Sequence, residues 1–242
     1  TPSLLSPNQI KDLLSHLRNQ FGFQEGAEIT LEVDPASFNK SDLEGYIHAG
    51  VNRLSLGAQS FQDSRLEELG RRHRSYHLLE ACRWIDEFYK AGQLCSWSID
   101  LIHSLPKQDL DEWKKELSTA LGVKAPHFSI YELSIESGTV FEWKERRGEI
   151  EMPNEEMALE MMCFTSSILS KNGYTRYEIS NYALPGHASR HNRVYWSGAG
   201  WWGFGQGATS APWGERFSRP RTRKGYSCWI ESQEKEGLEK SL

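Results

Sequence analysis

Four strand-like segments alternate with helix-like segments over the first half of the sequence. The strand-like segments cover residues 28–35, 52–61, 97–106 and 127–136, and each is apolar with polar side chains at its end. This alternation predicts an α/β fold in which parallel strands are joined by crossover helices. Because the carboxyl ends of parallel strands open on one side, we expect the polar residues there to share one pocket. These residues are Glu32, Asp34, Gln59, Asp100 and Glu132.

Helix signals precede and separate these segments. Ser6 suits an N-cap, Pro7 the first helical position, and Gln9 completes a capping box. After Ser180 the sequence is rich in Gly, Trp and His with little periodicity, which predicts two domains, residues 1–183 and 184–242. Further helices are expected at residues 41–49, 63–69, 76–90, 109–121 and 154–171, and a fifth strand at 175–179.

Composition excludes several classes of protein. The chain has 242 residues with 28 basic and 33 acidic side chains, and its net charge of −5 does not favour nucleic-acid binding. No apolar run approaches the length of a membrane span. The chain does not begin with Met, so we expect a fragment or processed product that is truncated at the N-terminus and incomplete at the C-terminus.

Four cysteines are spread widely along the chain. None lies within three residues of another, which matches neither a zinc site nor a cluster-binding motif and is too sparse for a disulfide framework. We expect buried free thiols in a reducing compartment. The cysteines are Cys82, Cys95, Cys163 and Cys228.

Polar residues at the first two strand ends suit ligand binding. Glu32 and Asp34 share one face by strand alternation, and their carboxylates could bind an ammonium group or a sugar hydroxyl, although Asp34 could merely cap the next loop. Gln59 could read a ribose or an adenine edge where Gly57 leaves room, or it could cap a loop. Arg71 lies in a basic cluster and could either pair with a ligand carboxylate or stay solvated.

Asp100 is the strongest candidate for a ligand-binding residue because it lies within an apolar strand. A buried carboxylate is costly unless a ligand hydroxyl or a neighbouring backbone donor satisfies it. His103, one position beyond that strand, fits a loop residue better than a catalyst. His191 opens the segment HNRVYW, where an imidazole could ligate haem iron and the aromatic rings could stack on the macrocycle. The glycine-rich residues 203–210 are followed by no lysine, so we interpret them as a tight strand and turn near the pocket rather than a phosphate loop.

Together these strings resemble one family. LEVDP, NRLSLGAQSF, SIDLIHSLP, YEISNYA and HNRVYW occur in the order and approximate spacing of the HemN/HemW group of radical S-adenosylmethionine (SAM) proteins. That group contains oxygen-independent coproporphyrinogen III oxidases and the haem chaperone HemW. The resemblance implies a partial (β/α) barrel of the radical SAM type, with parallel strands and outer helices.

The resemblance also implies a set of ligand-binding positions. Its SAM-contacting positions fall on Thr1, Glu32, Gln59, Arg71, Asp100, Ser134 and Thr209. Ser134 and Thr209 are positions where the residue type varies or departs from the family pattern. His191 falls on the haem-binding segment proposed for the chaperone branch, which favours a haem chaperone over the oxidase.

The cluster motif of the family is missing from the sequence. A [4Fe-4S] cluster needs three cysteines in CxxxCxxC spacing, and we expect these upstream of Thr1, so no residue of this chain is a metal ligand. The resemblance implies a protein that binds SAM, the cluster and haem and delivers haem to acceptor proteins. The alternatives are oxidative decarboxylation of coproporphyrinogen III and, less well matched, a sugar-phosphate barrel enzyme. We expect a cytoplasmic location, or chloroplast or mitochondrion if a transit peptide is missing.

Overall fold

A computed structural model describes residues 2–236 of the chain. The structure divides into two compact units between Ala188 and Ser189, and each is described separately below. The two domain ranges expected from the sequence stay a prediction. Within residues 2–236, every helix is too short or too polar to cross a membrane.

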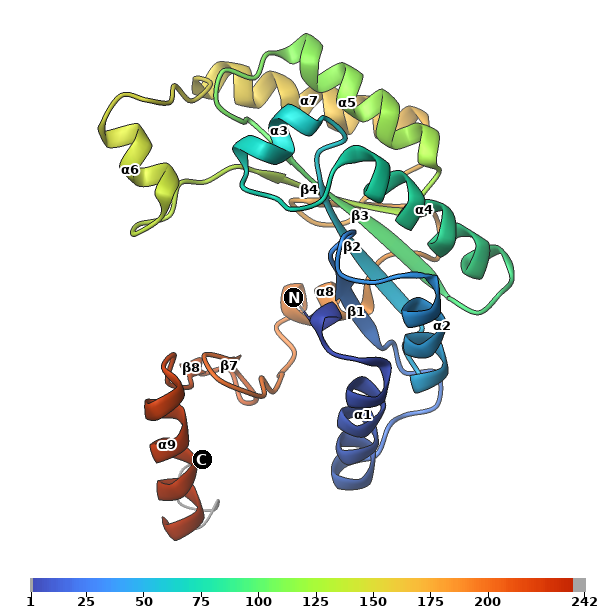
Figure 1. Ribbon diagram of the computed structural model, residues 1–242, viewed down its shortest axis with the longest axis vertical. Helices are drawn as coiled ribbons and strands as arrows, with labels where there is room; N and C mark the ends of the chain where they lie inside the picture. Colours follow the sequence, from blue (N-terminus) through green and yellow to red (C-terminus); the bar gives the residue numbers. More distant parts are fainter. Residues whose placement is uncertain (1, 237–242) are drawn as a thin grey trace. The chain divides into compact units, whose positions relative to one another are not determined.

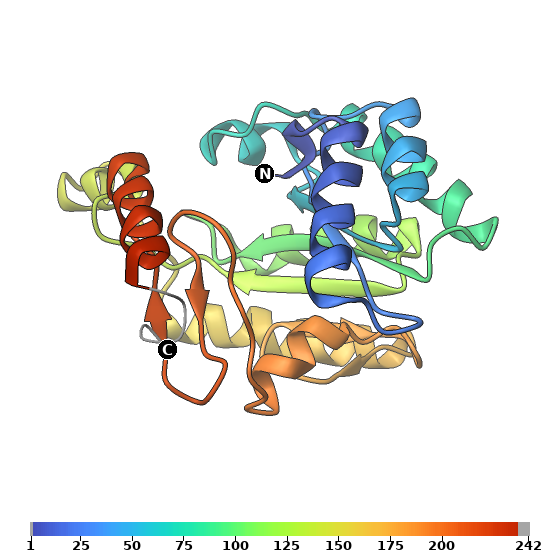
Figure 2. The same ribbon diagram turned by 90° about the horizontal axis from the view of Figure 1, so that it is seen from below.

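The first unit contains one sheet of six strands in the order β1-β2-β3-β4-β6-β5. The first four are parallel neighbours, as the alternation predicts, and the arrows of β3 and β4 point the same way in Figure 2 while Figure 1 shows all four in series. The α/β prediction is therefore confirmed for this part of the sheet. The parallel strands are β1 (Thr30–Val33), β2 (Arg53–Gln59), β3 (Ser96–His103) and β4 (His127–Glu132).

The last two strands differ from the expectation that all strands are parallel. The fifth strand expected at 175–179 is instead the short β5 (Thr175–Arg176), followed by β6 (Asn181–Ala183). β5 pairs with β6 antiparallel, and β6 pairs with β4 antiparallel. Only residues 177–180 separate β5 from β6, which is too short for a crossover helix, so the pair forms a hairpin.

Seven α-helices and a short 3₁₀ helix accompany this sheet in the described part of the first unit. The capping box predicted at Ser6 is confirmed, since its side chain accepts from the Gln9 amide and the Gln9 side chain accepts from the Ser6 amide. The helix α6 was not expected from the sequence because its seven residues show no apolar period. The helices are η1 (Pro2–Leu4), α1 (Pro7–Phe21), α2 (Lys40–Ala49), α3 (Asp63–Glu68), α4 (Ser75–Lys90), α5 (Leu110–Val123), α6 (Val140–Arg146) and α7 (Glu155–Lys171).

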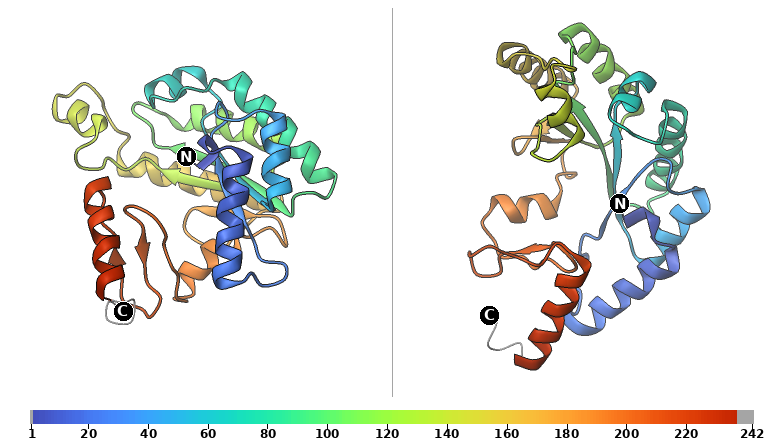
Figure 3. Two further views of the ribbon diagram at one scale, coloured as in Figure 1. Left: turned by 60° about the horizontal axis from the view of Figure 1, so that its bottom comes forward. Right: turned by 60° about the vertical axis from the view of Figure 1, so that its left-hand side comes forward.

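The two faces of the sheet differ in polarity. On one face, apolar side chains of β2, β3 and β4 are buried in the core; they include Leu54, Leu56, Trp97, Ile99 and Phe128. Helices α2, α4, α5 and α7 lie along this outer side (Figure 3). Because strand residues alternate between faces, the polar residues between these apolar ones project to the opposite, inner face. The sequence therefore separates a packed outer side from a polar inner side that can hold a ligand.

The second unit contains two helices and a hairpin among its described residues. They are α8 (Arg190–Trp196), β7 (Thr209–Ser210), β8 (Phe217–Ser218) and α9 (Arg223–Glu236). β7 and β8 pair antiparallel, and α9 lies beside them in Figure 3. Residues 203–210 make the tight turn expected, because the backbone at Gly203 lies so close to the Thr209 carbonyl that a Cβ would be 2.1 Å from its oxygen.

The segment HNRVYW lies on a helix, although the sequence after Ser180 shows little periodicity. Ser189 caps α8, its hydroxyl accepting a hydrogen bond from the Asn192 amide at 3.2 Å. A seven-residue helix is held by such a cap more than by an apolar stripe, which is why periodicity did not reveal it.

Candidate functional site

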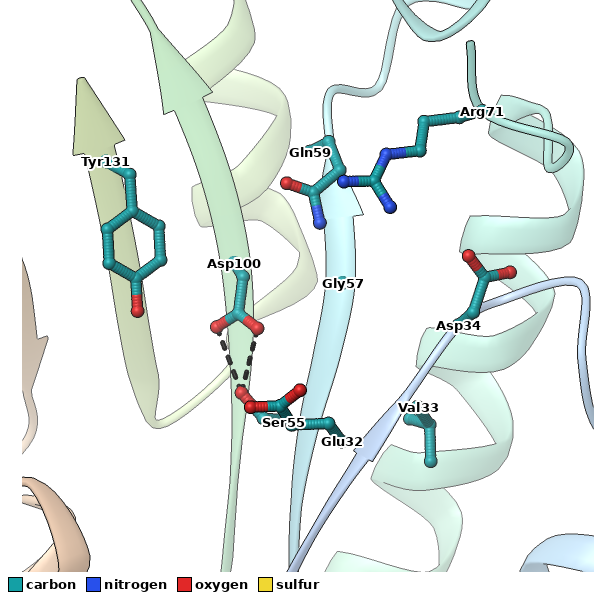
Figure 4. A pocket seen from close by; sticks show the side chains of 9 residues that line it. All are labelled: Glu32, Val33, Asp34, Ser55, Gly57, Gln59, Arg71, Asp100 and Tyr131. Carbon is teal, nitrogen blue, oxygen red and sulfur yellow. Dashed lines mark hydrogen bonds between the residues drawn. The ribbon is translucent and has the colours of Figure 1, made fainter. Parts of the chain in front are cut away.

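A pocket of about 270 Å³ opens at the carboxyl ends of the four parallel strands (Figure 4). Each of these strands contributes at least one lining side chain, and the segment between α3 and α4 adds Arg71. Residues scattered over a hundred positions of sequence therefore meet in one place. The lining residues are Glu32, Val33, Asp34, Ser55, Gly57, Gln59, Arg71, Asp100 and Tyr131.

Asp100 is the most strongly perturbed acid of the pocket. Burial raises the pKa of Asp100 to about 6; hydrogen bonds from Ser129 and Ser55 oppose the rise, and the nearby Glu32 adds to it. The Ser55 hydroxyl donates to the two carboxylate oxygens at 2.8 and 3.1 Å. Since that single proton is used, Ser98 must donate to Ser55 across 2.8 Å. Side-chain hydroxyl groups, rather than backbone amides, thus supply part of the hydrogen bonding that the Asp100 carboxylate needs.

Gln59 adopts an unusual backbone conformation at the end of β2. Its φ of 65° lies in the left-handed region, and the pairing of β2 with β3 is irregular between Leu56 and Gln59. The amide folds back over Gly57, where a Cβ would lie 3.0 Å from the Gln59 Nε2 atom. In Figure 4 the Arg71 side chain points toward Gln59, whose amide turns toward the side of Asp100. Glycine at position 57 therefore makes room for the Gln59 amide.

Arg71 is held in place through its backbone. Its amide donates to the Leu66 carbonyl at 2.8 Å, and its carbonyl accepts from Arg74 Nη1 at 2.9 Å. The guanidinium can therefore reach into the pocket from a fixed base, which suits a two-pronged contact with a carboxylate.

Asp34 both lines the pocket and caps the following turn. Its Oδ1 accepts from the Ala36 amide at 3.0 Å. The neighbouring His73 side chain lowers the pKa of Asp34 most, with help from the Ala36 amide and Arg71 against the effect of burial. The His73 Nδ1 atom is 3.8 Å from Oδ2. Asp34 is therefore ionised. It caps the following loop, which was one of the two alternatives expected from the sequence, and it also lines the pocket.

Several sequence-predicted residues lie elsewhere. The expectation that Glu132 shares the pocket is wrong, because alternation along β4 turns Tyr131 to the inner face instead. Ser134 is exposed beyond the end of β4 and does not line this pocket. Thr209 and His191 belong to the second unit. Thr1 lies outside the described residues.

Sequence reasoning missed the apolar lining residue Val33 and two polar ones, Ser55 and Tyr131. The two polar residues could have been found from the same alternation, since Ser55 lies four positions before Gln59 on the inner face and Tyr131 pairs with Ile102, two positions after Asp100. The prediction rested on charged and amide side chains at strand ends, and it therefore omitted a hydroxyl in the middle of β2 and a tyrosine on β4.

His103 is the last residue of β3 and faces away from the pocket. Its ring lies 5.5 Å from that of Trp113 on α5, and its Nδ1 is 2.9 Å from the Ser104 hydroxyl. Burial lowers the pKa of His103 to about 4. It is therefore a neutral residue of the outer core, and not the loop residue expected.

Neither the cysteines nor the acids form a metal site in the described part of the chain. Among residues 2–236, no group of three His, Cys, Asp or Glu side chains could hold a metal ion. The four cysteines are free, but only Cys82 is buried, so the expectation of four buried thiols is wrong for Cys95, Cys163 and Cys228. Spacing alone carries no information about burial, which explains the error.

Comparison with known proteins gives both a fold and relatives. No protein-family model matches the chain. "Heme chaperone HemW" of Synechocystis sp. is 40% identical over 232 residues, which cover 96% of this chain and 55% of that protein. The protein of the same name from Haemophilus influenzae is 35% identical over 93% of this chain and 58% of its own length. "Radical S-adenosyl methionine domain-containing protein 1, mitochondrial" of Danio rerio is 35% identical over 86% of this chain and 46% of its own. The chain thus spans about half the length of these relatives.

A solved structure shares the fold. It is described as "Coproporphyrinogen III oxidase (HemN) from Escherichia coli is a Radical SAM enzyme", and it matches with a TM-score of 0.78 and 23% identity, covering 96% of this chain and 55% of that chain. The parallel strands, outer helices and polar pocket therefore form a partial (β/α) barrel of the radical SAM type. With the sequence relatives, this shows that the chain belongs to the HemN/HemW group of radical SAM proteins.

Proposed function

We propose that this protein is a haem chaperone of the HemW type, which binds haem and delivers it to acceptor proteins. The observation that carries the proposal is the similarity, at 35–40% identity over most of the chain, to several proteins named "Heme chaperone HemW". The family implies SAM and a [4Fe-4S] cluster as cofactors, and at a reduced cluster SAM supplies radical chemistry.

The pocket fits SAM by the chemistry of its side chains. Asp100 carries a carboxylate that is mostly ionised at neutral pH, because its pKa is about 6, and it can accept a hydrogen bond from a ribose hydroxyl. Arg71 can take the methionyl carboxylate, and Glu32 an ammonium group. Gln59 offers both a donor and an acceptor to the nucleoside. The remaining members of the proposed set, Thr1, Ser134 and Thr209, rest on the family resemblance alone.

The cluster cannot be held by residues of this sequence in the family's manner. Radical SAM clusters need three cysteines in CxxxCxxC spacing, and the sequence contains no such motif. In our proposal the cluster ligands are therefore not among these 242 residues.

The surroundings of His191 on α8 suit its proposed role as a ligand of haem iron. The exposed His191 ring stands edge-on to Tyr195 at 4.8 Å between ring centroids, and Tyr195 lies 4.7 Å from Trp201. An exposed imidazole beside a row of aromatic rings suits ligation of haem iron with stacking on the porphyrin. The proposed cytoplasmic location stays a prediction, because the relatives include proteins named as mitochondrial.

The proposal is tested on the full-length gene product under anaerobic, reducing conditions. Haem binding and transfer to an apo-acceptor without porphyrinogen decarboxylation would support it. Formation of decarboxylated coproporphyrinogen III would contradict it and would support the oxidase instead. For the haem ligand, His191→Ala should change the visible spectrum and weaken haem binding about tenfold or more, whereas the neighbouring Arg190→Ala should keep the spectrum. An unchanged spectrum in His191→Ala would remove that assignment.

SAM binding has its own matched pair. Arg71→Lys keeps the charge but loses the planar fork, so we expect SAM affinity to fall about tenfold. Arg72→Lys is the control, because this neighbour is exposed and does not line the pocket of Asp100. Equal effects of the two substitutions on the dissociation constant would contradict the assignment of Arg71.

A further inference from the structure

Glu116 is a buried carboxylate that lies outside the ligand pocket. It belongs to α5 and is only 2% exposed, whereas the other buried residues of that helix, Trp113, Leu117 and Ala120, are apolar. Burial raises the pKa of Glu116, and hydrogen bonds from Gln62 and the Phe61 amide oppose that rise. Burying a carboxylate lowers the free energy of unfolding unless hydrogen-bond partners compensate for the lost water. The partners of Glu116 therefore indicate its role.

The partners of Glu116 are the residues that follow β2. The Phe61 amide donates to Oε1 at 2.5 Å, and Gln62 Nε2 donates to Oε2 at 3.0 Å. The Gln62 amide in turn donates to the Ser60 hydroxyl at 3.0 Å. Both oxygens of one buried carboxylate therefore hold the segment that comes directly after Gln59.

One turn earlier, α5 holds α3, the helix to which this connection leads. Glu112 accepts from Arg65 Nε at 2.6 Å and from Nη2 at 2.7 Å, a two-pronged ion pair. Arg65 Nη1 also donates to the Pro106 carbonyl at 2.9 Å. Two carboxylates on one face of α5 thus fix the connection from β2 to α3.

Gln59 needs such support because of its backbone. A left-handed conformation at a non-glycine residue is strained and persists only where the surroundings enforce it. On one side, His73 Nε2 is 3.0 Å from the Ala58 carbonyl, to which it donates; on the other side, Glu116 binds the Phe61 amide. Gln59 lies between these two anchors, and its amide reaches the pocket.

We propose that Glu116 is a positioning residue of the ligand pocket: it holds Gln59 in its left-handed conformation with the amide turned toward the ligand, and it does not touch the ligand. Only the identity of the ligand as SAM rests on the proposed function. The positioning itself concerns the backbone of residues 58–62 and can be measured without any ligand.

The first test is hydrogen–deuterium exchange of the full-length protein. Glu116→Ala should raise amide exchange in residues 58–62 about tenfold or more. The control is Thr165→Val, which removes a buried hydroxyl that accepts from Trp113 Nε1 at 2.8 Å and donates to the Met161 carbonyl, and which should leave residues 58–62 unchanged. If Glu116→Ala fails to fold, Glu116→Gln keeps the shape and one acceptor oxygen and should show a smaller rise. Unchanged exchange at 58–62 in the folded Glu116 variant would overturn the proposal.

The second test is a double-mutant cycle on SAM binding. Glu116→Ala and Gln59→Ala should each weaken binding about tenfold, and the double variant should be no weaker than the poorer single one, because Glu116 acts through Gln59. Thr165→Val should change the dissociation constant by less than about twofold. Additive losses would overturn the proposal. If the wild-type protein binds no SAM, the SAM assignment fails, while the exchange result still decides on Glu116.

Discussion

At the scale of single residues, the buried carboxylate of Asp100 lowers the stability of the folded state. Asp100 sits among hydroxyl groups that only partly replace water, which is why its pKa is about 6 rather than the ordinary 3.8. A raised carboxyl pKa means that the ionised form destabilises the folded state at neutral pH. Such a cost is typical of a group kept for a ligand rather than for the fold.

We therefore expect Asp100→Asn to stabilise the fold while weakening the ligand site. At pH 7 the free energy of unfolding should rise by about 1–3 kcal/mol, since two pKa units correspond to roughly 2.7 kcal/mol. The gain should shrink as the pH falls through 6 toward 4, where the wild-type carboxyl is protonated in the folded state. Urea unfolding at pH 7, 6, 5 and 4 would measure it, together with SAM binding, which should weaken about tenfold. Asp100→Asn less stable than wild type at pH 7 would contradict this account.

Prediction from the sequence succeeded at residues that the strand ends determine. Glu32, Gln59 and Asp100 were placed together because their strands are apolar and parallel, so the register had few alternatives. Glu132 was misplaced by one position, since a charged residue beyond the last buried one does not reveal which face it takes. The left-handed φ of Gln59 has no local signal at all, because it depends on Glu116, which is 57 positions away in the chain.

At the scale of elements, local signals explain most of the helices. α1, α5 and α7 begin at capped positions, with side chains of Ser6, Asp109 and Asn154 accepting from the first-turn amides. Where the sequence failed, at α6, α8 and the β5–β6 hairpin, the elements are short and their pairing depends on tertiary contacts. The hairpin, for example, lies against β4, whose position no pattern within residues 175–183 specifies.

The cap of α1 provides a test at this scale. Ser6→Ala removes the acceptor for the Gln9 amide, and the free energy of unfolding should fall by about 1 kcal/mol. Ser15→Ala is the control, because Ser15 is exposed in the middle of the same helix, where alanine is the better helix former. Thermal or urea unfolding would measure both. A loss in Ser15→Ala as large as that in Ser6→Ala would show that the cap is not the cause.

At the scale of the whole molecule, the folded state should be sensitive to acid. Burial, with Arg53 and His187 nearby, lowers the pKa of His127 to about 3, and burial lowers that of His103 to about 4. Both histidines are therefore neutral in the folded state at pH values where the unfolded chain, with an ordinary pKa near 6.5, already binds protons. These two groups therefore leave the stability unchanged above pH 6.5 and lower it progressively as the pH falls below that value.

The loss should exceed what the pocket gains. Between pH 7 and pH 5 each of the two histidines costs roughly 2 kcal/mol, while protonation of Asp100 returns roughly 1 kcal/mol, so the wild-type free energy of unfolding should fall by about 3 kcal/mol. Asp100→Asn lacks the opposing contribution, and its free energy of unfolding should fall by about 1 kcal/mol more over the same range. If His127→Gln folds, its free energy of unfolding should fall by about 2 kcal/mol less than that of the wild type over this range, because one of the two histidine titrations is removed. A wild-type protein equally stable at pH 5 and pH 7 would mean that the buried histidines are hydrated in solution, and for His127, which pairs with Ser98 on the inner face, that would require this face to be open to water well below the level of Asp100.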